Sequence, residues 1–161
     1  MTRALAACLA AFAALVLLAC RADGIPDVYG VRLGMTASDV RDRFTGTGGT
    51  FKADVAADDY SIRWTPGPDA KLEAKGGGPN PLSVEFAFHM GSLVAIVARV
   101  PADAPVASGP TYVVTKAGVL KRAPAEPSSG LAGVAIDVLA RDCPTHKARA
   151  EALVAEAQNA K

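Results

Sequence analysis

The sequence is poor in the residue types that mark several common classes of protein. Its 161 residues include only 3 cysteines, 2 histidines and 1 tryptophan, and its formal net charge is +1. A charge this close to zero argues against a strongly basic nucleic-acid binder and against an acidic disordered chain. The sequence contains no phosphate-binding glycine loop and no Gly-x-Ser-x-Gly motif. It therefore implies no cofactor and no nucleic-acid partner.

The apolar residues are concentrated at the N-terminus. Residues 4–19 form an uninterrupted apolar run behind Arg3, whereas a helix that spans a bilayer needs roughly 20 apolar residues. A short apolar run behind a positive residue is typical of a secretory signal peptide. The remainder has the apolar content of an ordinary globular domain and is long enough for one such domain without disulfides.

The apolar run ends in Leu17-Leu18-Ala19-Cys20, which resembles the lipobox of bacterial lipoproteins. The resemblance implies cleavage after Ala19, attachment of diacylglycerol to the Cys20 thiol and acylation of the new N-terminus. Several acyl chains hold a protein stably on a membrane, so we expect a lipid-anchored envelope protein. The alternatives are an ordinary secreted protein and an uncleaved short anchor. In a Gram-negative host, Arg21 after the cysteine favours the periplasmic face of the outer membrane, because aspartate there would favour inner-membrane retention.

The sequence divides into a signal peptide over residues 1–19, a tether over 20–29 and a single domain over 30–161. Within the domain, Thr36 and Asp39 have capping-box spacing, which predicts a helix over residues 37–44. An Ala-rich stripe with helical spacing predicts a second helix over residues 145–158. This stripe consists of Ala150, Leu153, Val154 and Ala157.

Most of the remaining domain carries strand patterns. Residues 82–89 and 93–100 form the clearest hairpin, and the aromatic residues Trp64, Phe86 and Phe88 fall on alternating positions that predict a core. We therefore predict an α+β fold, in which an antiparallel β-sheet packs against a short N-terminal helix and a C-terminal helix. The predicted strands are 50–55, 60–64, 71–75, 82–89, 93–100, 112–115, 119–122 and 134–139.

Two motifs within residues 30–100 resemble the SmpA/OmlA family of outer-membrane lipoproteins. Gly34-Met35-Thr36 opens the first helix, and Phe88-His89-Met90-Gly91-Ser92-Leu93 leads toward Ile96 as in the hairpin of that family. The family fold is two short helices on a three-stranded antiparallel sheet, and its role is accessory to the insertion of β-barrels. The resemblance implies a non-enzymatic, protein-binding role. Residues 101–161 form a C-terminal extension beyond it.

Cysteine usage points to one unpaired thiol in the mature protein. Cys8 leaves with the signal peptide and Cys20 is consumed by lipid, so Cys143 has no partner in an oxidising compartment. Within the sequence Cys143-Pro144-Thr145-His146, Cys143 lies just before the second predicted helix, whose N-terminal amides favour a thiolate. We therefore treat Cys143 as a candidate redox thiol, against the alternative that it is only a structural cysteine.

A metal site is the other chemistry that this stretch suggests. Cys143 and His146 supply two potential ligands, and His89 is the other histidine of the sequence. Zinc sites use three or four protein ligands, so these residues form a small set for a metal centre.

The sequence leaves three functions open. We expect a lipid-anchored, non-enzymatic protein-binding module, acting in outer-membrane assembly or maintenance. The first alternative is a small hydrolase or a metal or redox protein that uses Cys143, His146 and His89. The second alternative is an inhibitor-like or ligand-sensing lipoprotein.

Overall fold

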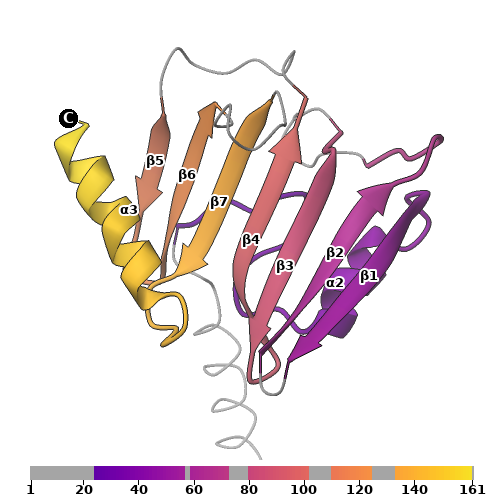
Figure 1. Cartoon of the computed structure of the whole chain (residues 1–161), viewed down its shortest axis with the longest axis horizontal. Helices are drawn as coiled ribbons and strands as arrows, with labels where there is room; N and C mark the ends of the chain where they lie inside the picture. The colour runs from indigo at the N-terminus through magenta and orange to yellow at the C-terminus, as the bar shows by residue number, and fades with distance from the viewer. Residues whose placement is uncertain (1–23, 57–58, 73–79, 102–109, 125–132, 161) are drawn as a thin grey trace, which may run out of the picture.

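The computed structural model describes residues 24–56, 59–72, 80–101, 110–124 and 133–160. Its centre is a seven-stranded sheet in which every neighbouring pair is antiparallel (Figure 1). The order is β1-β2-β3-β4-β7-β6-β5, so the last strand along the chain lies beside β4 in the middle. The strands are β1 (Gly49–Ala56), β2 (Asp59–Pro66), β3 (Ser83–His89), β4 (Ser92–Val100), β5 (Thr111–Val114), β6 (Gly118–Pro124) and β7 (Val134–Ala140).

Two helices accompany the sheet, which confirms the predicted α+β class. Helix α2 (Ala37–Phe44) has the predicted bounds, because the capping box forms: the Thr36 hydroxyl accepts a hydrogen bond from the Asp39 amide at 3.2 Å. The Asp39 carboxylate accepts the Thr36 amide at 3.0 Å in return. Helix α3 (Lys147–Asn159) begins two residues later than predicted. No helix in the described ranges is long and apolar enough to cross a membrane.

The two helices lie on opposite faces of the sheet. Val40 and Phe44 of α2 pack into the main core together with Trp64, whereas Ala150 and Leu153 of α3 pack against the other side of the sheet. We call these sides the α2 face and the α3 face. In Figure 1, α2 lies behind β1 and β2, and α3 runs beside β5 at the opposite margin.

An aromatic cluster forms the core of the α2 face. Trp64, Phe86 and Phe88 are 0%, 0% and 1% exposed, which confirms their predicted place in the core. The ring of Phe44 lies 5.1 Å from that of Trp64 and 5.4 Å from that of Phe86. Each fully buried ring contributes about 2–3 kcal/mol of transfer free energy. This cluster therefore holds α2 on strands β2 and β3.

Part of the predicted tether belongs to the domain instead. Ile25, Val28 and Tyr29 are 7%, 7% and 8% exposed and join the main core. The sequence around these three side chains contains proline and glycine, which is typical of a flexible linker. Burial of the three apolar side chains nevertheless gives a favourable free energy that holds the segment on the domain. The backbone of Val28 and Val31 also exchanges two hydrogen bonds of 2.9 and 3.0 Å. The tether prediction was therefore wrong for residues 25–29.

The predicted strand over residues 71–75 is not present in its described part. Lys71 and Leu72 belong to no strand, and residues 73–75 lie outside the described residues. The position beside β2 is taken by β3, and the Leu72 amide donates to the side chain of Asn80 at 3.1 Å. The predicted signal peptide and Cys20 also lie outside the described residues.

Candidate functional site

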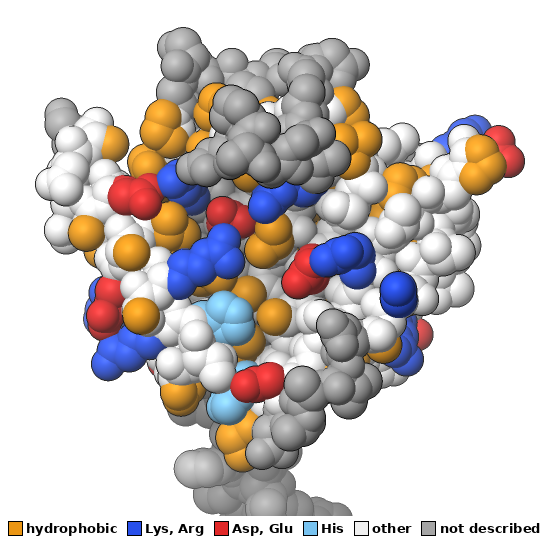
Figure 2. Space-filling view, in the orientation of Figure 1, with side chains coloured by type: hydrophobic (Ala, Val, Ile, Leu, Met, Phe, Trp, Pro, Cys, Tyr) orange, Lys and Arg blue, Asp and Glu red, His pale blue; other side chains and the backbone are white. Residues whose placement is uncertain are grey.

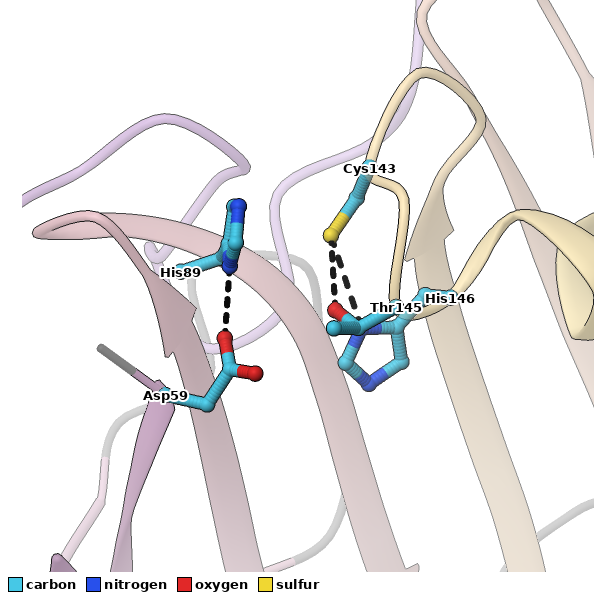
Figure 3. A network of polar contacts seen from close by, with 5 residues as sticks. All are labelled: Asp59, His89, Cys143, Thr145 and His146. Carbon is cyan, nitrogen blue, oxygen red and sulfur yellow. Dashed lines mark hydrogen bonds and ion pairs between the residues drawn. The ribbon is translucent and has the colours of Figure 1, made fainter. Parts of the chain in front are cut away.

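Asp59 and His89 form a hydrogen-bonded pair on the α3 face. They stand directly opposite each other in the antiparallel pairing of β2 with β3, where facing side chains lie about 5 Å apart at Cβ. An Asp59 carboxylate oxygen lies 2.6 Å from Nδ1 of His89 (Figure 3). The strand register therefore creates the pair, and it leaves Nε2 of His89 outside this contact.

Cys143, Thr145 and His146 form a second polar group in the connection from β7 to α3. The Cys143 sulfur lies 3.0 Å from the Thr145 hydroxyl oxygen and 3.7 Å from Nδ1 of His146. The backbone closes a turn here, since the His146 amide donates to the Cys143 carbonyl at 3.1 Å. Cys143 is only 4% exposed. The turn thus holds a buried thiol against an imidazole.

These two groups come from distant parts of the sequence and lie near each other. Burial lowers the pKa of His146 from its ordinary value, and the charge of Arg149 lowers it further. The charge of Asp59 raises the pKa of His146 and the charge of His89 lowers it, so both side chains are close enough to affect the His146 ring. Figure 2 shows the two histidines on the same face of the molecule. The lowered pKa of His146 favours the neutral form of its imidazole.

This arrangement supplies a thiol–imidazole pair. Within the described ranges, no three side chains of His, Cys, Asp or Glu are placed to hold one metal ion together. The predicted candidates Cys143 and His146 are in contact, but His89 is paired with Asp59 instead. The i,i+3 spacing in the sequence indicated the first contact. The contact between His89 and Asp59 depends on the register of β2 and β3, which the strand patterns do not specify.

The α3 face also carries a row of charged side chains that the sequence did not indicate. Arg63 bonds to Glu85 at 2.7 Å, in neighbouring positions of β2 and β3. Further along the row, the Asp137 carboxylate lies 3.3 Å from the guanidinium of Arg149 and 3.8 Å from that of Arg99. Figure 2 shows these basic and acidic types gathered on this face. Acidic and basic side chains adjoin each other along the row, although Asp137 faces two arginines, so the row does not create a strong field of one sign.

The two edges of the sheet differ in length and cover. Strand β5 has four residues, and its Tyr112 hydroxyl donates to Glu156 of α3 at 3.2 Å. Strand β1 has eight residues and pairs only with β2. Among the described residues, the backbone of 50–56 makes no hydrogen bond outside the pairing with β2. β1 is therefore the long edge of the sheet, and no described element pairs with its outer side (Figure 1).

Comparisons with known proteins give no relative from which to carry over a function. No protein-family model, no curated protein and no solved structure matches this chain. The geometry of the chain's own residues is therefore the basis of the proposals below.

Proposed function

We propose that this protein is a lipid-anchored, non-enzymatic envelope domain that binds a protein partner, in outer-membrane assembly or maintenance. The anchor is supported by the lipobox resemblance that ends at Cys20. The observation that carries the binding role is the free edge of β1. In a Gram-negative host the domain would face the periplasm from the outer membrane.

A free edge of this length is suited to strand addition. Its outward N–H and C=O groups can pair with an extended segment of another chain, which gives affinity through the backbone. Natural edges are usually blunted by proline, by several charges or by a covering element. The sequence of β1 has no proline and only two charged residues, Lys52 and Asp54. The opposite edge, β5, is short and packs against α3.

The side chains beside the β1 edge define the partner segment. Phe51 is half-buried and meets Phe44 at a ring distance of 5.8 Å, so an apolar residue placed next to it would extend the aromatic core. Lys52 points to the other face, is exposed, and makes no ion pair with a described residue. An acidic residue there would complement it. The partner segment is thus an extended strand with an apolar residue beside Phe51 and an acidic residue beside Lys52.

Crosslinking in intact cells tests this role. A photo-crosslinking residue at position 52 is expected to trap one defined envelope protein, whereas the same residue at Lys147, an exposed lysine of α3 away from β1, is not. The trapped protein is then purified and added to the domain. Hydrogen exchange of the β1 amides should slow at least about tenfold when it binds. Binding that leaves exchange in β1 unchanged would contradict the edge as the binding site.

The anchor is tested separately. Mass spectrometry of the mature N-terminus should find Cys20 as the first residue, carrying diacylglycerol and an acyl group. The Cys20→Ser variant is expected to leave the membrane fraction. A mature protein that begins elsewhere, without lipid, would contradict the anchor.

Thiol chemistry at Cys143 is a second candidate function, favoured by the contact between its sulfur and His146. If the pair is reactive, the Cys143 thiolate attacks glutathione disulfide, forms a mixed disulfide and releases one glutathione thiolate. His146→Asn should then slow the reaction. A reaction slower in the folded protein than in the unfolded chain, and unaffected by His146→Asn, would assign Cys143 to structure alone.

A further inference from the structure

The described chain begins at one end of the sheet. A Cβ at Gly24 would lie 3.3 Å from the side chain of Thr115, and one at Gly118 would lie 3.4 Å from that of Ile25. Thr115 and Gly118 close the turn between β5 and β6, with a hydrogen bond of 2.9 Å. The N-terminal segment therefore enters the fold beside this turn.

The distance to the proposed anchor is short. Cys20 precedes the buried residue Ile25 by five positions. A fully extended chain covers at most about 3.6 Å per residue, so the backbone of Cys20 lies within about 18 Å of the backbone of Ile25. The lipid-bearing sulfur adds only the length of the Cys20 side chain to this distance. If Cys20 is lipidated, this end of the sheet must therefore face the bilayer at close range.

The hairpin of β3 and β4 projects from the same end. Gly118 pairs with Ala140, and Leu139 pairs with Ala95, so the start of β6, the end of β7 and the start of β4 lie together. β4 begins at Ser92, three residues before Ala95, while β7 ends one residue after Leu139. At about 3.4 Å per residue, the hairpin extends roughly 7 Å beyond β7 (Figure 1).

Met90 forms the tip of this hairpin. It is 79% exposed, against 41% for Leu82 and 42% for Val114, the other large exposed apolar residues of the described chain. Its φ is +49° and that of Gly91 is +80°, as in a tight hairpin turn that favours Asn or Gly at both positions. A methionine in the left-handed region costs roughly 1 kcal/mol. The Met90 side chain is too exposed for packing within the described domain to offset that cost.

We propose that the anchored domain rests on the lipid bilayer through this end and that the Met90 side chain inserts among the lipid headgroups. This inference rests on the proposed lipid anchor at Cys20. An unbranched apolar side chain on a projecting turn suits the interface, where it loses contact with water. One such side chain binds too weakly to hold a protein on a membrane alone, so its effect is to orient a domain that the acyl chains already hold.

The charges at this end indicate which lipids are needed. Lys116 is exposed in the turn between β5 and β6, and Arg141 follows β7. They are offset by Asp142, which is exposed beside Arg141, and by Asp59 next to His89. Arg32 and Lys147 are also exposed near this end, so the described charges here are of both signs with a basic excess, and a zwitterionic bilayer is the stricter test because it adds no attraction for that excess.

Depth-dependent quenching tests the orientation. The lipidated protein carries Cys143→Ser and either Met90→Cys or Leu82→Cys, so a fluorophore can be attached at one end of β3 or the other. Each sample is reconstituted into phosphatidylcholine vesicles that contain a headgroup nitroxide quencher. The fluorophore at position 90 is expected to be quenched about twofold or more, and the one at position 82 hardly at all.

A second reporter separates contact from folding. A fluorophore at Lys116→Cys, at the same end, should be quenched in the parent protein and less so when Met90→Asn is added. Met90→Asn is expected to leave the free energy of unfolding unchanged or slightly raised, since Asn tolerates a positive φ. Equal quenching at positions 90 and 82 on vesicle-bound protein would overturn the orientation alone. Protein that does not float with the vesicles would overturn the anchor, and the orientation with it.

Discussion

Gly49 lies directly against the indole ring of Trp64, at the point where β1 begins. A Cβ at this position would overlap three atoms of the ring, Cε2, Nε1 and Cζ2. Trp64 Nε1 is also buried without a hydrogen-bond partner among the described residues. The ring is therefore positioned by packing, against the backbone of Gly49 on one side and the ring of Phe44 on another.

Gly49→Ala is expected to lower the free energy of unfolding by about 1–3 kcal/mol, because the added methyl group must displace a buried ring. The measurement is urea unfolding followed by tryptophan fluorescence, with Trp64 as the only tryptophan. With a smaller ring at position 64, part of the loss should disappear: Gly49→Ala should cost less in the Trp64→Phe background, monitored there by circular dichroism. Simple additivity of the two changes would contradict the contact.

Glu156→Gln is expected to loosen α3 from β6. Lys121 lies 2.5 Å from the Glu156 carboxylate; this contact raises the pKa of Lys121 and lowers that of Glu156. A lowered carboxyl pKa means that the stabilisation is present above the ordinary value of 4.5 and is lost as the pH falls through the folded-state value. Both side chains are partly exposed, so the loss at neutral pH should be at most about 1 kcal/mol. Glu151→Gln, on an exposed i,i+4 pair, is the matched control and should change stability less.

His146 is expected to make the fold sensitive to mild acid. Its pKa is lowered, mainly by burial and then by Arg149, so the folded protein favours the neutral ring. The stabilisation is therefore present above the ordinary value of 6.5 and is lost as the pH falls below it. Urea unfolding at pH values on both sides of 6.5 should show this fall, and His146→Gln should reduce it. His89→Gln, which removes the other histidine, should leave most of this acid-dependent fall in the free energy of unfolding.

Tyr29 is expected to titrate separately from the other tyrosines. Burial raises its pKa to about 12, although the charge of Arg122 acts in the opposite direction. A raised pKa means that the contribution to stability is present below the ordinary value of 10 and is lost as the pH rises toward 12. Ultraviolet absorbance of the phenolate should show one late tyrosine that is missing in Tyr29→Phe. Early titration of all the tyrosines would contradict its burial.

Local patterns in the sequence predicted the elements well. The spacing of Thr36 and Asp39 gave helix α2 its observed bounds, because a capping box is satisfied within four residues. Alternation predicted β3 and β4, since one face of each strand is buried almost without exception. The buried residues Ile25 and Val28 were missed because three apolar positions in a Pro- and Gly-containing segment have no helical or strand period.

The candidate site was predictable only where it is local. Cys143 and His146 are three residues apart, and the turn before α3 brings them into contact. Asp59 and His89 are 30 residues apart, and their contact depends on a strand register that the sequence pattern does not specify. The β1 edge likewise follows from the strand order, in which β1 pairs with β2 alone, and the sequence pattern does not specify that order.

The central place of β7 has a consequence for the order of folding. Strands β1 to β4 can form as a meander while the chain is being made, but β4 then presents an apolar edge until β7 pairs with it. The hairpin of β5 and β6 joins the sheet only through β7. Pairing of β4 with β7 is slow because the long connection between them must close, at a cost in entropy, before the stabilising contacts form. A chain that crosses a membrane from its N-terminus would therefore carry an aggregation-prone half-sheet until β7 emerges, and it would depend on a holding chaperone during that interval.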